Sequence, residues 1–369
     1  MQPIERVREA VRDFTPYAPG LSMDEIKERY GLTQVIKLAS NENPLGASPL
    51  VKRVLARKAD TVFRYPRAGN PALVAALAAA HGVPAGCVVA GNGSDEIIDL
   101  LARVTATPGR DNIVAFDPCF SIYVQQTRLC GVELRQVPLK ADFAFDLPAL
   151  ARAADEHTAL VFVTNPDNPS GHAVPADDLL RLAKDLPERA LLVVDEAYAD
   201  FAESEAVYSV MPRFAECDRL VVLRTFSKLY GLAGLRLGLG VMPDWLADYL
   251  LRVRLPFSVN LLAEAAGLAA LEDKAFLTAS RDTVLRGRAF VRDKLTALGC
   301  TVYPSQANFL MFKPTIAAAE LFEALLARGI IIRALKSYGL PELLRVSIGN
   351  DEENALFLAA VAEILGHGR

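Results

Sequence analysis

Short apolar runs alternate with amphipathic stretches through the first two thirds of the chain. The clearest runs, rich in β-branched residues, lie at 87–90, 112–116, 160–164, 191–194 and 219–223. Runs of this kind predict buried strands, and the stretches between them have the apolar spacing of helices. Because strands separated by helices are typical of βαβ units, we predict an α/β fold with a mainly parallel sheet covered by helices on both faces.

The pattern changes after about residue 256. A long helical region is predicted near 261–298, followed by apolar runs at 301–303, 308–312, 330–333 and 344–348 and by a C-terminal helix. This mixture is typical of a smaller α+β unit.

The start of the chain differs from both patterns, since it carries a short helix and a second one near Met23–Tyr30. We therefore predict three parts: an N-terminal arm at 1–35, a large cofactor-binding domain at 36–255 and a small C-terminal domain at 256–369.

Composition narrows the class of protein. Of 369 residues 52% are hydrophobic and 23% are charged, and the formal net charge is −4. This balance predicts a soluble protein without a basic surface for nucleic acid or membranes. The five scattered cysteines include no C-x-x-C pair and the four histidines have no ligand-spaced partner, so we predict free thiols in the cytoplasm and no metal site.

Neither a signal peptide nor a membrane span is expected. The N-terminal residues mix acids and bases and have no apolar core. The uncharged stretch at 71–94 is divided by Gly82, Pro84 and Gly86 into an alanine-rich helix, a turn and a strand.

Lys228 is the first candidate for chemistry. It follows the apolar run at 219–223, within the segment TFSKLYG at 225–231, and Arg236 comes eight residues later. A lysine can form a Schiff base with a carbonyl, including the aldehyde of pyridoxal phosphate (PLP), once a pocket holds it deprotonated. The hydroxyls and the arginine nearby are residue types that bind phosphate.

Asp195 is the second candidate, because it ends the apolar run LLVV at 191–194. The carboxyl ends of parallel strands face the ligand crevice, where a carboxylate can keep the pyridine nitrogen of PLP protonated. Tyr198, three residues further on, could reach the ring oxygen of PLP. The alternative is an ordinary helix N-cap aspartate.

Asn168 lies in the turn TNPDNPSG at 164–171, which also follows an apolar run. The prolines and the glycine predict a rigid turn, from which the amide could donate to a ring oxygen. The alternative is a plain strand-to-helix loop. The order Asn168, Asp195, Lys228, each after a predicted strand, is more specific than any one of them.

A phosphate site is predicted from the glycine-rich segment GNGSDE at 91–96, which leads from a strand into an apolar helix. Glycines let the backbone approach an anion, and a helix N-terminus attracts it. Ser94 is also expected to be the N-cap of this helix. Ser227 and Arg236 would complete the site. Phe120, in DPCFSIY at 117–123, is the candidate for stacking on the ring, with a core aromatic as the alternative.

In this order the segments resemble the fold-type-I PLP-dependent aminotransferases, the aspartate-aminotransferase superfamily. The likeness extends over essentially the whole chain, from PYAPG at 16–20 to LRVS at 344–347. NENP at 41–44 and RYP at 64–66 narrow it towards the histidinol-phosphate aminotransferase branch.

The resemblance implies cofactor roles. Lys228 would be the Schiff-base lysine and Asp195 the partner of the pyridinium nitrogen. Asn168 and Tyr198 would bind the ring oxygen, and Phe120 would stack on the ring. The phosphate region would be lined by Ser94, Asp95, Thr225, Ser227 and Arg236.

It also implies substrate and subunit contacts. Arg345 matches an arginine that binds the α-carboxylate of the amino-acid substrate. Arg333 and Tyr17 match positions that contact substrate, including its phosphate group, and Asn43 is expected at the substrate mouth. Tyr65 matches a tyrosine that reaches the partner subunit's cofactor, which implies a homodimer with shared active sites.

Two positions depart from the resemblance. Phe120 stands where many relatives have tyrosine, which keeps a stacking ring and removes a hydroxyl. The loop RAGN at 67–70 lacks an aspartate that relatives often have after the RYP segment.

The implied reaction is a two-step transamination of L-histidinol phosphate with 2-oxoglutarate, giving imidazole acetol phosphate and L-glutamate in histidine biosynthesis. The alternatives are an aromatic amino-acid aminotransferase and a PLP-dependent decarboxylase of a phosphorylated amino acid. A non-catalytic regulator on the same fold is disfavoured, because the arm before residue 36 is short and not basic.

Overall fold

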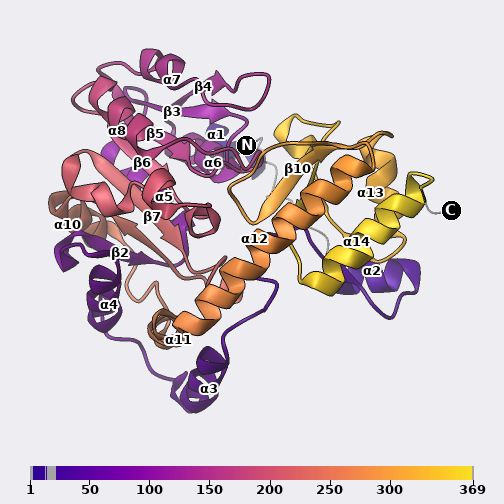
Figure 1. Cartoon of the computed structure of the whole chain (residues 1–369). Coiled ribbons are helices and arrows are strands. Elements are labelled where there is room, and N and C mark those ends of the chain that lie inside the picture. The colour runs from indigo at the N-terminus through magenta and orange to yellow at the C-terminus, as the bar shows by residue number, and fades with distance from the viewer. Residues whose placement is uncertain (1–2, 13, 15–21, 368–369) are drawn as a thin grey trace.

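The computed structural model describes residues 3–12, 14 and 22–367, and a seven-stranded sheet forms the centre of its larger part (Figure 1). The strand order is β2-β8-β7-β6-β5-β3-β4. Only β8 runs antiparallel to its neighbours, so the prediction of a mainly parallel sheet is confirmed. The bounds are β2 Val88–Gly91, β3 Asn112–Asp117, β4 Glu133–Pro138, β5 Thr158–Thr164, β6 Leu191–Asp195, β7 Leu220–Thr225 and β8 Gly238–Val241.

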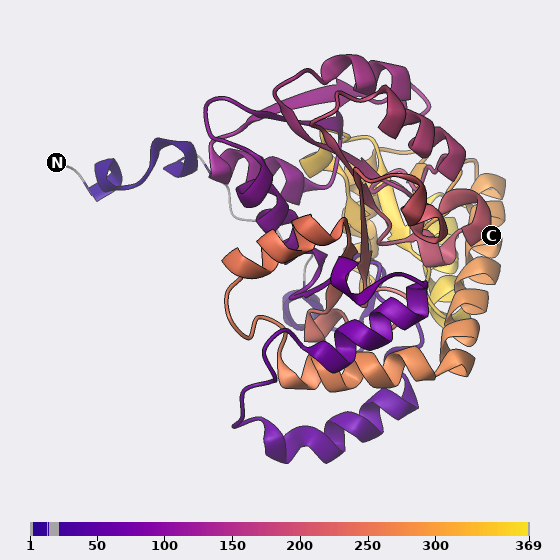
Figure 2. The same cartoon turned by 90° about the vertical axis from the view of Figure 1, so that its left-hand side faces the viewer.

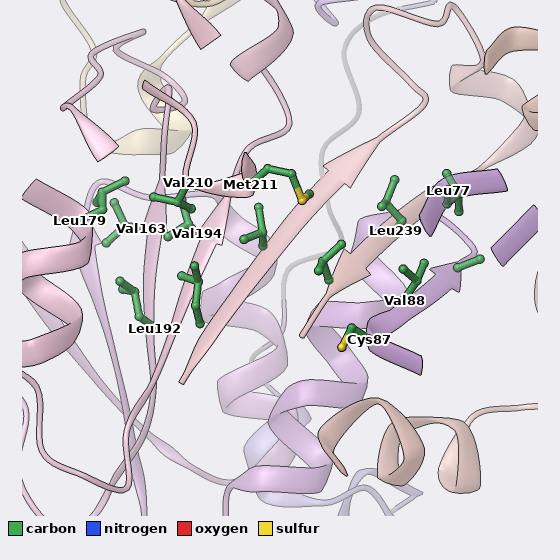
Figure 3. Close-up of a cluster of buried hydrophobic side chains, with 14 of the residues drawn as sticks. Leu77, Cys87, Val88, Val163, Leu179, Leu192, Val194, Val210, Met211 and Leu239 are labelled. Carbon is green, nitrogen blue, oxygen red and sulfur yellow. The ribbon is translucent and has the colours of Figure 1, made fainter. Parts of the chain in front are cut away.

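Both faces of this sheet are covered by helices, because its central strands are apolar at every position. In β5, Val161 and Val163 point into one buried cluster, whereas Leu160 and Phe162 point into another on the opposite face. Figure 3 shows part of the first cluster, with Leu179 of a covering helix beside Val163.

Different helices cover the two faces of the seven-stranded sheet. The first is covered by α3 Pro49–Lys58, α4 Pro71–His81, α7 Leu147–Ala153, α8 Ala176–Asp185 and α11 Leu261–Glu272. The second is covered by α5 Ser94–Thr105, α6 Ser121–Cys130 and α10 Asp244–Val253. The short α9, Glu205–Tyr208, lies between β6 and β7 in the chain.

A smaller antiparallel sheet forms the second part, in the order β12-β13-β10-β9. Its strands are β9 Thr301–Val302, β10 Phe309–Lys313, β12 Arg333–Ala334 and β13 Leu344–Ser347. Three helices bury their apolar sides against it: α12 Lys274–Ala297, α13 Ala318–Leu326 and α14 Asp351–Ile364. Figure 1 shows α12 running from beside α11, next to the larger part, to the smaller sheet.

Residues near the start of the chain pack with this second part. The helix α2, Met23–Tyr30, is found where it was predicted, and its Ile26 is buried against Leu326 and Ile331. The strand β1, Ile36–Lys37, pairs in parallel with β11, Ile330–Ile331. The three-part division predicted from sequence stays a prediction, since the structure describes one packed molecule.

The N-terminal segment extends away from the body in Figure 2. It holds a 3-10 turn at Pro3–Arg6 and the short helix α1, Glu9–Arg12. Arg8 ties it to α6 by donating from Nη2 to the backbone oxygen of Leu129 at 3.0 Å.

Several predicted elements were wrong in detail. The predicted helical region at 261–298 is helical, but it is divided into two helices, because Asp273 caps α12 by accepting from the backbone N–H of Phe276. The run at 330–333 is two short strands that pair in different sheets. The strands β4 and β8 were not predicted.

Each of these missed strands has a physical reason. β4 is an edge strand with mostly polar residues and a terminal Pro138. β8 begins at Gly238, where a Cβ atom would collide with the backbone of Ser94, so a residue that disfavours strands is required there.

Candidate active site

A cavity of about 500 Å³ lies at the carboxyl ends of β5, β6 and β7, between this edge, the start of α5 and the smaller sheet. It brings together most of the residues predicted from sequence, although they are far apart in the chain. Those that line it are Ser94, Asp95, Phe120, Asn168, Asp195, Tyr198, Thr225, Ser227, Lys228, Arg236, Arg333 and Arg345.

Lys228 projects into this cavity just beyond the end of β7. Its Nζ donates to the backbone oxygen of Ser40 at 3.0 Å. Burial, and next the positive charge of Arg345, lower the pKa of Lys228 from 10.5 to about 8. An amine with this pKa is partly neutral near physiological pH, so it can act as a nucleophile and as a base.

Asp195 is the last residue of β6 and is 3% exposed. Its Oδ2 accepts from the hydroxyl of Tyr123 at 2.8 Å, and its Oδ1 accepts from the backbone N–H of Ala197 at 3.1 Å. Burial raises the pKa of Asp195 to about 6, although both hydrogen bonds act in the opposite direction. The N-cap alternative is not found, because Tyr198 occupies the N-cap position of the next helical turn.

The start of α5 corrects one expectation. Ser94 is the first residue of the helix, and Gly93 occupies the N-cap position with a φ of 76°, so the prediction that Ser94 is the N-cap was wrong. A Cβ at residue 93 would lie 2.7 Å from Nη2 of Arg236. The glycine therefore leaves room for a guanidinium group at the helix N-terminus.

Arg236 connects this helix to the loop after β7. Its Nη2 donates to Oδ2 of Asp95 at 3.1 Å, and its Nη1 donates to Oγ of Ser227 at 3.4 Å. The backbone N–H of Ser227 donates to Oγ1 of Thr225 at 3.1 Å. Hydroxyls, a helix N-terminus and a guanidinium group around one end of a cavity suit a phosphate dianion.

Arg345, in β13, lies on the opposite side and is buried. It donates from Nη1 to Oδ1 of Asn168 and from Nη2 to the backbone oxygen of Ala39 at 2.9 Å. Its Nε is buried and has no hydrogen-bond partner among the described residues. A buried guanidinium with an unsatisfied N–H favours the arrival of an anion.

Tyr198 is held by the segment that crosses the cavity at 39–42. Its hydroxyl accepts from Nδ2 of Asn41 at 3.1 Å, and burial raises the pKa of Tyr198. Asn41 is itself fixed in the left-handed region, with a φ of 56°, by a hydrogen bond from its backbone N–H to Oγ of Ser347 at 2.8 Å. The phenol therefore stays protonated and can donate to a ligand oxygen.

Phe120 occupies the N-cap position of α6 and lines the cavity. Its ring also packs on the core beneath the sheet and meets the ring of Tyr123 edge-on, with centroids 5.7 Å apart. The residue thus combines the two alternatives considered from the sequence, a cavity ring and a core aromatic.

Two expected site residues within the described chain, Tyr65 and Asn43, are not brought into the cavity. Tyr65 is 80% exposed and stacks on Phe257 with ring centroids 4.7 Å apart. Asn43 donates from Nδ2 to the backbone oxygen of Leu229 at 2.6 Å and to Oγ of Ser280 at 3.0 Å, so its amide joins two parts of the chain. Tyr17 lies outside the described residues.

Sequence reasoning missed several residues that belong to the site, including Ser40, whose backbone oxygen accepts from Lys228. Asn41, Thr164 and Tyr338 line the cavity, and Tyr123 contacts Asp195 from beneath it. For Tyr123 a signal was present, since it follows Phe120 by three residues and this spacing places both on one side of a helix.

The residues present fit PLP. Asp195 is a buried carboxylate that accepts from two neutral donors, the Tyr123 hydroxyl and the Ala197 backbone, which suits a cationic ring nitrogen. The amide of Asn168 and the phenol of Tyr198 could meet the ring oxygen, and the cradle around Gly93 and Arg236 could hold the phosphate. No cluster of metal-ligating side chains was found in the described chain, nor any helix long and apolar enough to cross a membrane.

The site places a lysine and a buried aspartate at the carboxyl ends of parallel strands, in a sheet with helices on both faces. This arrangement is typical of PLP-dependent transferases. The chain belongs to the aminotransferase class I and II family, which it matches over residues 33–361.

The relatives to which it is similar share a narrower name. The histidinol-phosphate aminotransferase of Nitratidesulfovibrio vulgaris strain DP4 is 61% identical over 361 residues, covering 98% of this chain and 97% of the relative. That of Shouchella clausii is 41% identical and covers 97% of each chain. The solved histidinol-phosphate aminotransferase of Sinorhizobium meliloti, in complex with pyridoxal-5'-phosphate, has a TM-score of 0.86 at 26% identity, covering 98% of this chain and 97% of that one. The family resemblance found in the sequence is therefore confirmed.

Proposed function

We propose that this protein is a PLP-dependent transaminase that transfers the amino group of L-histidinol phosphate to 2-oxoglutarate. The products are imidazole acetol phosphate and L-glutamate, and the reaction belongs to cytoplasmic histidine biosynthesis. One observation carries the proposal: a single cavity joins Lys228 and Asp195 to two arginines, Arg333 and Arg345. The identity of 61% to a histidinol-phosphate aminotransferase supports the choice of substrate.

The cofactor would be held at both ends. Asp195 would hold the ring nitrogen, Asn168 and Tyr198 the ring oxygen, and Phe120 one face of the ring. The phosphate would be bound by the start of α5 and by the hydroxyls and guanidinium next to it: Ser94, Asp95, Thr225, Ser227 and Arg236. When bound there, PLP acts as an electron sink that makes the α-hydrogen of an attached amino compound acidic.

Lys228 would move the proton. With a pKa of about 8 its Nζ can take the proton from the α-carbon of the substrate and return it elsewhere without a large free-energy penalty. The backbone oxygen of Ser40, 3.0 Å away, gives the free amine a fixed place within the cavity. The segment at 39–42 thus positions the base.

Two arginines would bind the anionic groups of the substrates. Arg345 would receive the carboxylate of the amino-acid co-substrate, because it is buried and under-satisfied at Nε. Arg333, which lines the same cavity, would receive the phosphate of histidinol phosphate. The roles expected for Tyr17 and Asn43 stay predictions.

We also propose a homodimer with shared active sites. Tyr65 lies in an exposed apolar patch made by Val62, Phe63, Tyr65 and Phe257, which line one surface hollow; Phe63 is 75% and Phe257 is 41% exposed. Exposed apolar side chains gathered in this way favour burial against another surface. A second copy placed there would bring Tyr65 towards the partner's cavity.

The test is an absorbance spectrum of the purified protein with PLP, before and after histidinol phosphate is added without any oxoacid. We expect a visible band that bleaches, and its recovery on addition of 2-oxoglutarate. A band that bleaches only with phenylalanine or tyrosine would establish the aromatic aminotransferase instead, and release of carbon dioxide would establish the decarboxylase. If no band forms with PLP, the proposal is wrong.

A further inference from the structure

The carboxylate of Asp195 has one side-chain hydrogen-bond donor, the hydroxyl of Tyr123, among the residues that the structure describes. Tyr123 lies in the first turn of α6 and is 1% exposed. Its ring stacks on Phe162, with centroids 4.3 Å apart and planes 13° apart, so packing fixes the direction of the hydroxyl. Tyr123 is not among the residues that line the cavity, so its phenol acts on the site through Asp195.

The hydroxyl of Tyr123 bridges two strand ends. It lies 2.8 Å from Oδ2 of Asp195 and 2.8 Å from Oγ1 of Thr164. Thr164 and Asp195 are register partners at the ends of β5 and β6. Because the hydroxyl of Thr164 can donate to Tyr123, the phenol is free to give its own proton to the carboxylate.

This hydrogen bond opposes the effect of burial. Desolvation raises the pKa of Asp195, and the charges of Asp95, at the start of α5, and Glu196, next in sequence, raise it further. The bonds from Tyr123 and from the backbone of Ala197 lower it. Burial also raises the pKa of the Tyr123 phenol, to which the nearby Asp195 and Cys119 contribute, so Tyr123 stays a donor.

We propose that Tyr123 is a positioning residue for this reaction, which holds the Asp195 carboxylate ionised and oriented towards the ring nitrogen of PLP. The inference rests on the proposed PLP-dependent function. Without the phenol hydroxyl the carboxylate would keep one backbone donor and would take up a proton at a higher pH. A protonated Asp195 cannot hold the ring nitrogen as a cation.

The experiment titrates the cofactor-free chain with PLP at several pH values and follows the visible absorbance. Tyr123→Phe removes the hydroxyl and keeps the ring on Phe162. We expect its Kd for PLP to rise by about tenfold, because a hydrogen bond to a charged group is lost. The pH below which PLP binding weakens should move upward by about one unit.

Phe162→Leu is the matched control, since it disturbs the packing under Tyr123 and leaves the hydroxyl in place. We expect a lower Tm for this variant and a wild-type pH midpoint for PLP binding. The inference is overturned if Tyr123→Phe has the wild-type Kd and midpoint, or if Phe162→Leu shifts the midpoint equally. If the wild-type chain itself gives no band with PLP, the proposed function has failed instead.

Discussion

Arg333 and Arg345 are register partners in the antiparallel pair β12–β13, and both line the cavity. Directly opposed side chains in such a pair stand close together on the same face, and like charges in this position destabilise the sheet. The arrangement becomes favourable when anionic groups bind between or beside the two guanidinium groups. Under the proposed function the smaller sheet would contribute the two substrate-binding arginines, and the larger sheet would contribute Asp195 and Lys228.

Arg333→Gln tests the phosphate contact. We expect KM for histidinol phosphate to rise by about a hundredfold, because a charge-assisted pair to phosphate is lost. KM for 2-oxoglutarate should change much less. A variant with equal losses for both substrates would contradict the assignment of Arg333 to the phosphate.

Lys228→Ala tests the base. We expect kcat to fall by roughly four orders of magnitude or more, since Lys228 is the proposed base for the proton at the α-carbon. PLP should still bind, because the phosphate cradle does not include the lysine amine, and its spectrum should resemble that of free PLP. Measured turnover near the wild-type value would rule out Lys228 as the base.

Asp195→Asn should have opposite effects on the stability of the cofactor-free protein and on its affinity for PLP. The buried carboxylate has a pKa raised to about 6 from 3.8, so the folded chain binds its proton more tightly than the unfolded chain does. Stability of the cofactor-free protein therefore falls as pH rises from about 4 to about 6 and stays lower above it. At pH 7 the asparagine variant should be more stable by about 3 kcal/mol, a difference that vanishes near pH 4.

The same variant should bind PLP more weakly at pH 7, which titration of the visible band measures. Urea unfolding at pH 4.5 and pH 7 gives the free energies of unfolding for both proteins. If the variant is less stable than the wild type at pH 7, the ionised Asp195 carboxylate stabilises the folded protein, and the prediction is wrong.

Shared active sites can be tested by mixing two inactive variants. Lys228→Ala keeps Tyr65, and Tyr65→Ala keeps Lys228. If Tyr65 acts on the partner's cavity, a mixed dimer contains one site with both residues intact, so activity returns after the variants are unfolded and refolded together. If Tyr65 acts within its own chain, the mixture stays as inactive as its components.

Arg224 is expected to stabilise the region below the cavity. It is buried and donates to Glu196 and to Asp200, each at 2.8 Å. Arg224→Met leaves the fully buried Glu196 without its cation, so we expect a loss of about 3–5 kcal/mol in the free energy of unfolding.

Arg213→Met is the control for this prediction. Arg213 pairs with Asp177 and Glu216 at the surface, and exposed pairs of this kind contribute about 0–1 kcal/mol. Urea unfolding of both variants checks the difference. If both variants lose the same free energy of unfolding, the buried ion pairs of Arg224 contribute no more to stability than the surface pairs of Arg213.

The sequence alone predicted the arrangement of Asn168, Asp195 and Lys228, because the carboxyl ends of adjacent parallel strands must converge. Apolar runs in the central strands are long enough to be found without tertiary information. The same holds for α2, whose capping residues Ser22 and Glu25 stand in the sequence.

Other features depend on contacts that no local pattern records. The bond from Tyr123 to Asp195 joins residues 72 positions apart. Asn41 takes a left-handed conformation because Ser347, far along the chain, holds its backbone. A glycine is needed at position 238, at the start of β8, because the backbone of Ser94 leaves no room for a side chain there.

The pairing of β1 with β11 has a consequence for synthesis of the chain. Ile36 meets Ile330, and the backbone oxygen of Leu38 accepts from the N–H of Ser347 at 2.8 Å. The segment that supplies Ser40 to the lysine is therefore fastened by β11 and β13, which are synthesised after every strand of the large sheet. Translation can complete the strands of the large sheet first, but the nascent chain can acquire a finished cavity only after β11 and β13 have emerged.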